Sequence, residues 1–220
     1  MAPIQEWMFY PKPSGLPKSV ELTTKQLLDR LQIVLDTNAS VVSQALRPGL
    51  SDTRIAELEM GGGFRLTEGL KALYRWHDGM VTNSQVGLLP GYHFVPLEES
   101  VQTRELMRSQ QASATLAQRV AFSLFLGFRK NWIQILDDGA GDGYFYDPER
   151  AEAGGALFYH MSEVGYYRWF PSLENYLTGI IQCYENHAIK VSPDGKAIDE
   201  DSEQTKKIWE LLAASSDHGE

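Results

Sequence analysis

The sequence predicts an α+β fold in which helices pack on one face of an antiparallel, meander-like sheet. Apolar residues recur at helical spacing up to about residue 77 and again after Pro171, whereas short apolar and aromatic runs separated by turn residues fill the region between them. Helices, then a cluster of strands, then helices is the order typical of α+β domains. Because the connections between the expected strands are short, strands that are neighbours in sequence are expected to pair antiparallel.

The first expected helix begins near Thr23. Thr23 and Gln26 fit a capping box, in which each side chain accepts a hydrogen bond from the other residue's backbone N–H. Helical spacing then continues from Leu27 towards Leu46, and Arg47-Pro48-Gly49 ends it. Further helices are expected at 52–60, from 68 to 77, at 97–109, from 172 to 186 and around 208–212.

The expected strands lie between residues 86 and 160. They are Val86–Leu89 and Tyr92–Val95 on either side of Pro90-Gly91, followed by Trp132–Leu136, Gly143–Tyr146 and Ala156–His160. The apolar run Val120–Phe128 fits either a strand or a buried helix. Asp78-Gly79 is expected to form a turn.

The chain is expected to have three parts. Residues 1–22 contain four prolines and several aromatic residues, which predicts an extended N-terminal arm docked on the core. Residues 23–190 carry the expected helices and strands of the main domain, and residues 191–220 form a C-terminal helical extension. In that extension the acidic run Asp199-Glu200-Asp201 precedes the last helix and complements its N-terminus.

The composition favours a basic protein partner over nucleic acid or a membrane. The formal net charge is −9 and the sequence pI is near 5.1, so the surface repels phosphate groups and attracts basic proteins. Mild acidity also serves solubility alone. The single cysteine, Cys183, falls on an expected helix and is interpreted as a core thiol. Because no signal peptide or membrane-spanning run is apparent, we expect a cytoplasmic protein.

Several segments together resemble the SUKH superfamily, which includes the fungal cell-wall-assembly regulator domain. The similar segments are LRPGLSDTRIAELE (Leu46–Glu59), LTEGLKALYRWHDG (Leu66–Gly79), GLLPGYHFVPLEE (Gly87–Glu99) and WIQILDDGAGDGYFYDPE (Trp132–Glu149). Thr67 and Gln134 depart from the family pattern, which has proline at both places. The resemblance covers about residues 25–185 and implies a SUKH-like domain that binds proteins without catalysis. Bacterial members are often immunity proteins that neutralise a toxin, and fungal members are regulatory interaction modules.

The acidic segment from Asp137 to Gly143 is the first candidate binding element. Asp138 and Asp142 fall at positions one and five of a calcium loop, but Ala140 occupies position three and no helix precedes the segment. A turn between strands is therefore favoured over a calcium site. We expect Asp137, Asp138 and Asp142 to face basic side chains of a partner.

An aromatic set on the later strands is the second candidate. Strands alternate their faces, so half of these rings should point outwards, where tyrosine and tryptophan make good interface anchors. Burial of the same rings under a covering helix explains the pattern equally well. The residues selected as partner-binding are Tyr144, Tyr166, Arg168 and Trp169.

The sequence therefore favours an immunity protein that neutralises a basic toxin domain of a bacterial polymorphic or contact-dependent competition system. A regulatory scaffold with several partners is the alternative. An enzyme or small-molecule binder is the third reading and would need a deep polar pocket. No histidine lies at metal-ligand spacing, and Gly61-Gly62-Gly63 follows a helix and lacks the Gly-Lys-Ser/Thr of a phosphate loop. We thus expect no catalytic residues, no metal and no cofactor.

Overall fold

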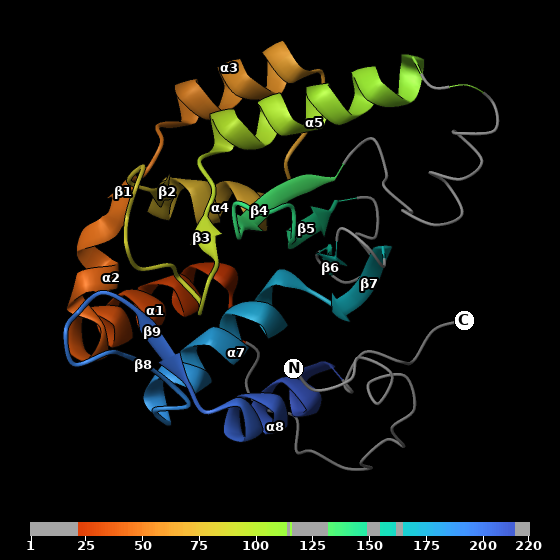
Figure 1. Ribbon diagram of the computed structural model, residues 1–220. Coiled ribbons are helices and arrows are strands. Elements are labelled where there is room, and N and C mark those ends of the chain that lie inside the picture. Colours follow the sequence, from red (N-terminus) through yellow and green to blue (C-terminus); the bar gives the residue numbers. More distant parts are fainter. Residues whose placement is uncertain (1–21, 114, 116–131, 149–154, 162–164, 214–220) are drawn as a thin grey trace.

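The computed structural model describes residues 22–113, 115, 132–148, 155–161 and 165–213, without the side chains of 110–111, 165–169 and 213. The helices are α1 (Thr24–Asn38), α2 (Ser40–Ala45), α3 (Asp52–Gly62), α4 (Glu68–Trp76), α5 (Leu97–Ser113), α7 (Leu173–Glu185) and α8 (Ser202–Ala213). The strands are β1 (Leu46–Pro48), β2 (His77–Met80), β3 (His93–Phe94), β4 (Ile133–Asp137), β5 (Gly143–Asp147), β6 (Ala156–Met161), β7 (Gly165–Phe170), β8 (Ile189–Val191) and β9 (Ile198–Glu200). The predicted α+β class is confirmed (Figure 1).

The central sheet is an antiparallel meander of five strands in the order β3-β4-β5-β6-β7. Its register aligns one residue from each strand in a single row that crosses the sheet. This row runs from His93 through Asp137, Gly143 and His160 to Tyr166. Since adjacent strands lie about 4.8 Å apart, the row brings residues that are distant in sequence to the same end of the sheet.

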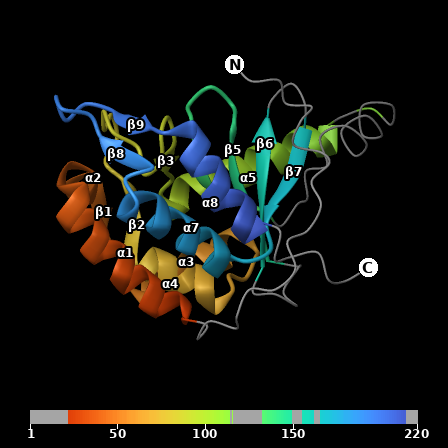
Figure 2. The same cartoon turned by 90° about the horizontal axis from the view of Figure 1, so that it is seen from below.

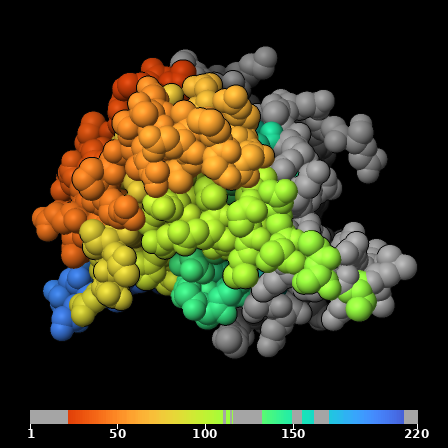
Figure 3. Space-filling model, turned by 90° about the horizontal axis from the view of Figure 1, so that it is seen from above, coloured from red at the N-terminus to blue at the C-terminus, as the bar shows by residue number. Residues whose placement is uncertain are grey.

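The main core fills the space between this sheet and helices α1, α4 and α7. Leu31, Leu70 and Ile180 contribute one buried side chain from each of these helices, and Tyr146 reaches the same core from β5. A smaller cluster of Trp132, Phe145 and Phe158 packs with Met107 of α5. Figures 1 and 3 show α3 and α5 side by side, forming one face of the molecule.

The capping box at Thr23 is confirmed. The Thr23 side chain accepts from the backbone N–H of Gln26, and the Gln26 side chain accepts from the backbone N–H of Thr23. The helical pattern that the sequence extends to Leu46 is interrupted at Ala39, whose φ of −150° and ψ of 51° are not helical. After this break α2 takes a new direction and buries Val42 and Ala45 in the core.

Two predictions, for Asp78-Gly79 and for Val86–Leu89, are wrong. Asp78-Gly79 is not a turn but part of β2, which pairs with β1 so that Leu46 faces Met80 and Pro48 faces His77. Val86–Leu89 is not a strand, because only an isolated bridge joins Leu89 to Tyr92. Tertiary pairing decides both cases, and local turn propensity does not report it.

Three predicted features lie outside the described residues: the N-terminal arm at 1–21, the apolar run Val120–Phe128, and the end of the C-terminal extension from residue 214. None of the helices in the described ranges is long and apolar enough to cross a membrane.

The C-terminal helix α8 packs directly on α7. The Trp209 ring stacks on Tyr176 with centroids 6.1 Å apart and meets Phe170 edge-on at 5.0 Å. A Cβ atom added to Gly179 of α7 would lie 2.2 Å from Cζ3 of Trp209. The contact therefore requires glycine at residue 179.

Replacing Gly179 with alanine is expected to lower the free energy of unfolding by roughly 1–3 kcal/mol, because the added methyl group displaces the Trp209 ring. Gly61 of α3 is the matched control, since an added Cβ there meets nothing within 4 Å. Alanine at Gly61 should raise stability by up to about 1 kcal/mol through better helix propensity. Urea unfolding of both variants tests the pair, and equal effects would disprove the close packing of α8.

Candidate functional site

The turn between β4 and β5 is built around the carboxylate of Asp138. One oxygen, Oδ1, accepts hydrogen bonds from the backbone N–H groups of Ala140 at 2.8 Å and Asp142 at 2.9 Å. The Asp138 N–H donates to the carbonyl of Asp142 at 3.1 Å, and Asp137 accepts from the N–H of Gly139 at 3.1 Å. Asp138 thus shapes the turn as well as carrying charge.

A tyrosine cluster lies beside this turn. It consists of Tyr92, Tyr144 and Tyr159, which are all half-buried. Tyr144 lies 5.2 Å from Tyr92 and 5.0 Å from Tyr159 between ring centroids, and the hydroxyls of Tyr92 and Tyr159 are 2.7 Å apart. Burial raises the pKa of each of the three, so the hydroxyls stay protonated at neutral pH and can donate hydrogen bonds.

Glu200 of β9 approaches the same cluster. The negative charge of Glu200 adds to burial and to Tyr159 in raising the pKa of Tyr144, and the charges of Asp138 and Asp142 act likewise on Tyr159. Asp199, Glu200 and Asp201 are all exposed. Figure 2 shows the β4–β5 turn and β9 along the same edge of the molecule.

We call Asp137, Asp138, Asp142, Asp199, Glu200 and Asp201 the acidic face. In the described part of the chain, no lysine or arginine nitrogen lies within 4.0 Å of a carboxylate oxygen of Asp137, Asp138, Asp199, Glu200 or Asp201. Many other carboxylates, such as Glu98 and Glu185, are paired with arginine. Five of the six acidic-face carboxylates therefore make no ion pair with a lysine or arginine of the described residues.

The predicted binding residues divide into two groups by position. Asp137 lies in the cross-strand row with Tyr166, and Asp138, Asp142 and Tyr144 lie next to that row. Arg168 pairs with Phe158, and with Trp169 it lies further along β7, away from this end of the sheet. The side chains of Tyr166, Arg168 and Trp169 are outside the described part, so their role in partner binding stays a prediction.

Sequence reasoning assigned Asp199, Glu200 and Asp201 only to the start of the last helix. That assignment holds for Asp201, whose carboxylate accepts from the N–H of Gln204 in the first turn of α8. The position of Glu200 beside the tyrosine cluster was missed. The signal that could have suggested it is the Ser192–Gly195 turn, since it joins β8 to β9 in a hairpin that turns the acidic run back along β8.

The groups that usually carry catalysis or bind metals were also located. Burial raises the pKa of the Cys183 thiol to about 12, so it is not a thiolate at neutral pH. Among the described residues, no group of three or more His, Cys, Asp or Glu side chains is arranged to hold a metal ion. Asp138 uses its carboxylate to hold the turn.

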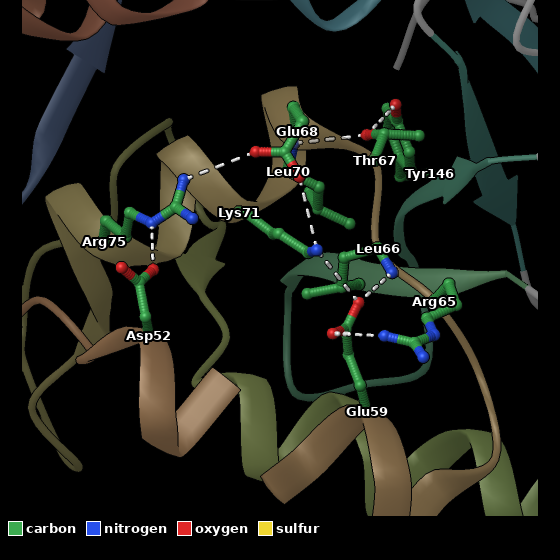
Figure 4. A network of polar contacts seen from close by, with 10 residues as sticks. All are labelled: Asp52, Glu59, Arg65, Leu66, Thr67, Glu68, Leu70, Lys71, Arg75 and Tyr146. Atoms are coloured by element: carbon green, nitrogen blue, oxygen red, sulfur yellow. Dashed lines mark hydrogen bonds and ion pairs between the residues drawn. The ribbon is translucent and has the colours of Figure 1, made fainter. Parts of the chain in front are cut away.

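A second polar centre joins α3 to α4 (Figure 4). Glu59 is buried, and its carboxylate accepts from the N–H of Leu66 at 2.6 Å and lies 3.6 Å from Nζ of Lys71. Thr67 caps α4 by accepting from the N–H of Leu70, and its hydroxyl lies 2.7 Å from that of Tyr146. Threonine at residue 67 therefore starts the helix that proline would start in the family pattern.

An open groove of about 710 Å³ lies beside this centre, lined by Ala56, Glu59, Met60, Gly63, Phe64, Arg65 and Pro148. Glu59 is largely occupied by its contacts inside the protein, so the centre orders the α3–α4 connection.

Comparison with known proteins agrees with this architecture. No curated protein matches the chain. A family model described as the SMI1 / KNR4 family (SUKH-1) matches residues 49–179, which is more than half of the chain. The matched span begins directly after β1 and ends within α7. It includes the α3–α4 centre and the β4–β5 turn, whereas β9 lies beyond it. The chain therefore belongs to the SMI1 / KNR4 family (SUKH-1).

Proposed function

We propose that this protein is a non-catalytic binding module whose acidic face and tyrosine cluster bind a basic protein partner. SUKH domains of this family are generally non-catalytic binding domains, which supports the first part of the proposal. The observation that carries the second part is that Asp137, Asp138, Asp199, Glu200 and Asp201 make no ion pair with a lysine or arginine of the described residues. Such charges accelerate encounter with a basic surface and are free to form new ion pairs.

The tyrosines supply the aromatic contacts that would hold the complex together after the charges have brought the partner close. Charged groups at a rim mainly affect association rate, whereas buried aromatic contacts hold a complex together. Tyr92, Tyr144 and Tyr159 are half-buried and already ordered by ring contacts, so little side-chain entropy is lost when a partner covers them. We therefore place the centre of the interface at the cluster and its rim at the carboxylates.

The partner that fits best is a basic toxin domain, which would make the protein an immunity protein of a bacterial competition system. A tight 1:1 complex with steered association suits neutralisation of a toxin. The alternative, a regulatory scaffold, predicts several weaker partners on the same surface.

A pull-down from the native host, washed at low and moderate salt, tests the proposal. One stoichiometric basic protein that survives moderate salt would support it. Several weak partners would favour the scaffold, and an acidic or neutral partner in a 1:1 complex would contradict the charge argument.

Once a partner is isolated, removal of charge from the acidic face should slow association severalfold at low salt and flatten its salt dependence. Asp199→Asn with Glu200→Gln is the best pair, because both side chains are exposed and neither makes a side-chain hydrogen bond within the described part of the chain. Asp138→Asn is preferred to charge reversal there, since the amide oxygen still accepts the turn hydrogen bonds. Stopped-flow or surface-based kinetics measure the rates.

Glu57→Gln with Glu99→Gln is the control, since it removes equal charge from exposed residues of α3 and α5. This pair should leave the association rate almost unchanged. Equal slowing by both double variants would show a general charge effect and would exclude the acidic face as the docking surface.

A further inference from the structure

His77 connects the N-terminal helices to the β1–β2 hairpin through both ring nitrogens. Nδ1 lies 2.6 Å from the backbone carbonyl oxygen of Arg47, and Nε2 lies 2.8 Å from Oε1 of Gln32. The amide nitrogen of Gln32 donates in turn to Oδ1 of Asp36 at 2.9 Å and to Oγ of Ser43 at 3.0 Å. The Ser43 hydroxyl also donates to Asp36. The network thus contains residues of α1, α2, β1 and β2.

The donors and acceptors of this network can be counted. A backbone carbonyl only accepts, so Nδ1 of His77 must carry a proton. The amide oxygen of Gln32 also only accepts, so Nε2 must carry a proton as well. Both ring nitrogens donate only in the imidazolium cation. The observed arrangement therefore contains one proton more than a neutral histidine supplies.

Turning the Gln32 amide over removes the need for a second proton on His77, but it costs the hydrogen bond from Gln32 to Asp36. The amide nitrogen would then donate to Nε2 of a neutral ring, but the amide oxygen would face the carboxylate of Asp36 at 2.9 Å. Ser43 has a single hydroxyl proton, which cannot serve both of these oxygens. The neutral state thus leaves one acceptor facing another, and the protonated state satisfies every member.

The charges around the ring determine when the proton binds. Burial lowers the pKa of His77, while the Arg47 carbonyl and the negative charge of Asp36 act in the opposite direction. Arg47 itself is paired with Asp78 at 3.1 Å, and the Trp76 ring meets His77 edge-on at 4.5 Å. Because burial is the largest of these effects, the proton is expected to bind below the ordinary histidine pKa of about 6.5.

We propose that His77, Gln32 and Asp36 form a proton-operated switch, in which protonation of His77 reorients the Gln32 amide and fastens α1 and α2 to the β1–β2 hairpin. Both helices precede the span matched by the family model, whereas His77 lies inside it. The switch therefore joins a residue inside the matched span to the two helices that precede that span. It is independent of the acidic face, which belongs to other elements.

Nuclear magnetic resonance of the intact protein between pH 5 and 8 tests the switch. The ¹⁵N shifts of the His77 ring should pass from a neutral Nδ1–H form to a doubly protonated form as the pH falls. The side-chain amide signals of Gln32 should shift with the same midpoint, since the amide changes partners in that step. A ring that keeps one proton down to pH 5, or Gln32 signals that do not move while His77 titrates, would overturn the proposal.

His77→Phe is the matched variant, because it removes both ring nitrogens and keeps an aromatic ring beside Trp76. Its Gln32 amide signals should lose their pH dependence between pH 5 and 8. If the same dependence persisted in this variant, Gln32 would be responding to another group and the switch would be excluded. Should His77→Phe fold poorly, Gln32→Met gives a second test, in which the His77 midpoint should move to lower pH because Nε2–H has lost its acceptor.

Discussion

Replacing Gly79 with alanine is expected to lower the free energy of unfolding by roughly 3 kcal/mol or more. Gly79 has a φ of +75°, which costs a residue with a side chain about 1–2 kcal/mol. An added Cβ would also lie 2.4 Å from the backbone nitrogen of Pro96, where the chain cannot move easily, and such overpacking costs about 1–3 kcal/mol. The neighbouring Asp78 holds the N–H of Leu97 at 2.9 Å, so the same contact positions the start of α5.

Gly63→Ala separates the two causes. Gly63 has a φ of +61°, but an added Cβ there meets nothing within 4 Å. This variant should therefore lose only the conformational part, about 1–2 kcal/mol. Urea unfolding of both proteins gives the comparison. If Gly79→Ala were no less stable than Gly63→Ala, the close approach of β2 to Pro96 would be wrong.

Replacing Glu59 with alanine should lower the free energy of unfolding by about 3 kcal/mol. The Glu59 side chain is only 4% exposed. Its removal leaves the N–H of Leu66 without its acceptor. It also takes the buried carboxylate away from Lys71, whose side chain is 19% exposed, so that Lys71 keeps only a weaker partner. An unsatisfied buried donor costs about 1–3 kcal/mol, and breaking a buried ion pair adds to that. Glu59→Gln should be milder, because its amide oxygen can still accept from Leu66.

Glu68→Ala is the control for this prediction. Glu68 contacts the same Lys71 at 3.3 Å and Arg75 at 3.7 Å, but 79% of its side chain is exposed. Exposed ion pairs contribute little, so this variant should lose less than about 1 kcal/mol. Similar losses for Glu59→Ala and Glu68→Ala would mean that burial of Glu59 does not determine the stability of the α3–α4 connection. Thermal or urea unfolding decides between the outcomes.

Helix ends were predictable because they depend on neighbours in sequence. The capping box at Thr23 and the start of a helix after Thr67 follow from side chains within four residues, and both are present. The end of α3 lies two residues later than expected, because Gly61 and Gly62 are still helical and Gly63 forms the cap. The strands β4, β5 and β6 were also found, since aromatic and β-branched runs bounded by glycine and aspartate are strong local signals.

Pairings between distant segments were not predictable from such signals. β1 is a three-residue strand ending in proline, and it forms because β2 lies opposite it. The same holds for β8 and β9, whose hairpin closes around Ser192–Gly195. Short strands of this kind have little intrinsic preference, so tertiary contacts determine them.

The candidate site likewise combines features that neighbouring residues determine with features that contacts between distant segments determine. The sequence by itself determined the α+β class, the family resemblance, the acidic β4–β5 turn and the negative charge that favours a basic partner. Only the tertiary structure decided that Glu200 lies beside the tyrosine cluster next to that turn. It also decided that Tyr166 shares the cross-strand row of Asp137, while Arg168 and Trp169 lie further along β7. The physical reason is that charge and local propensity belong to single residues and their neighbours, whereas a binding face depends on strand register and helix packing over the whole chain.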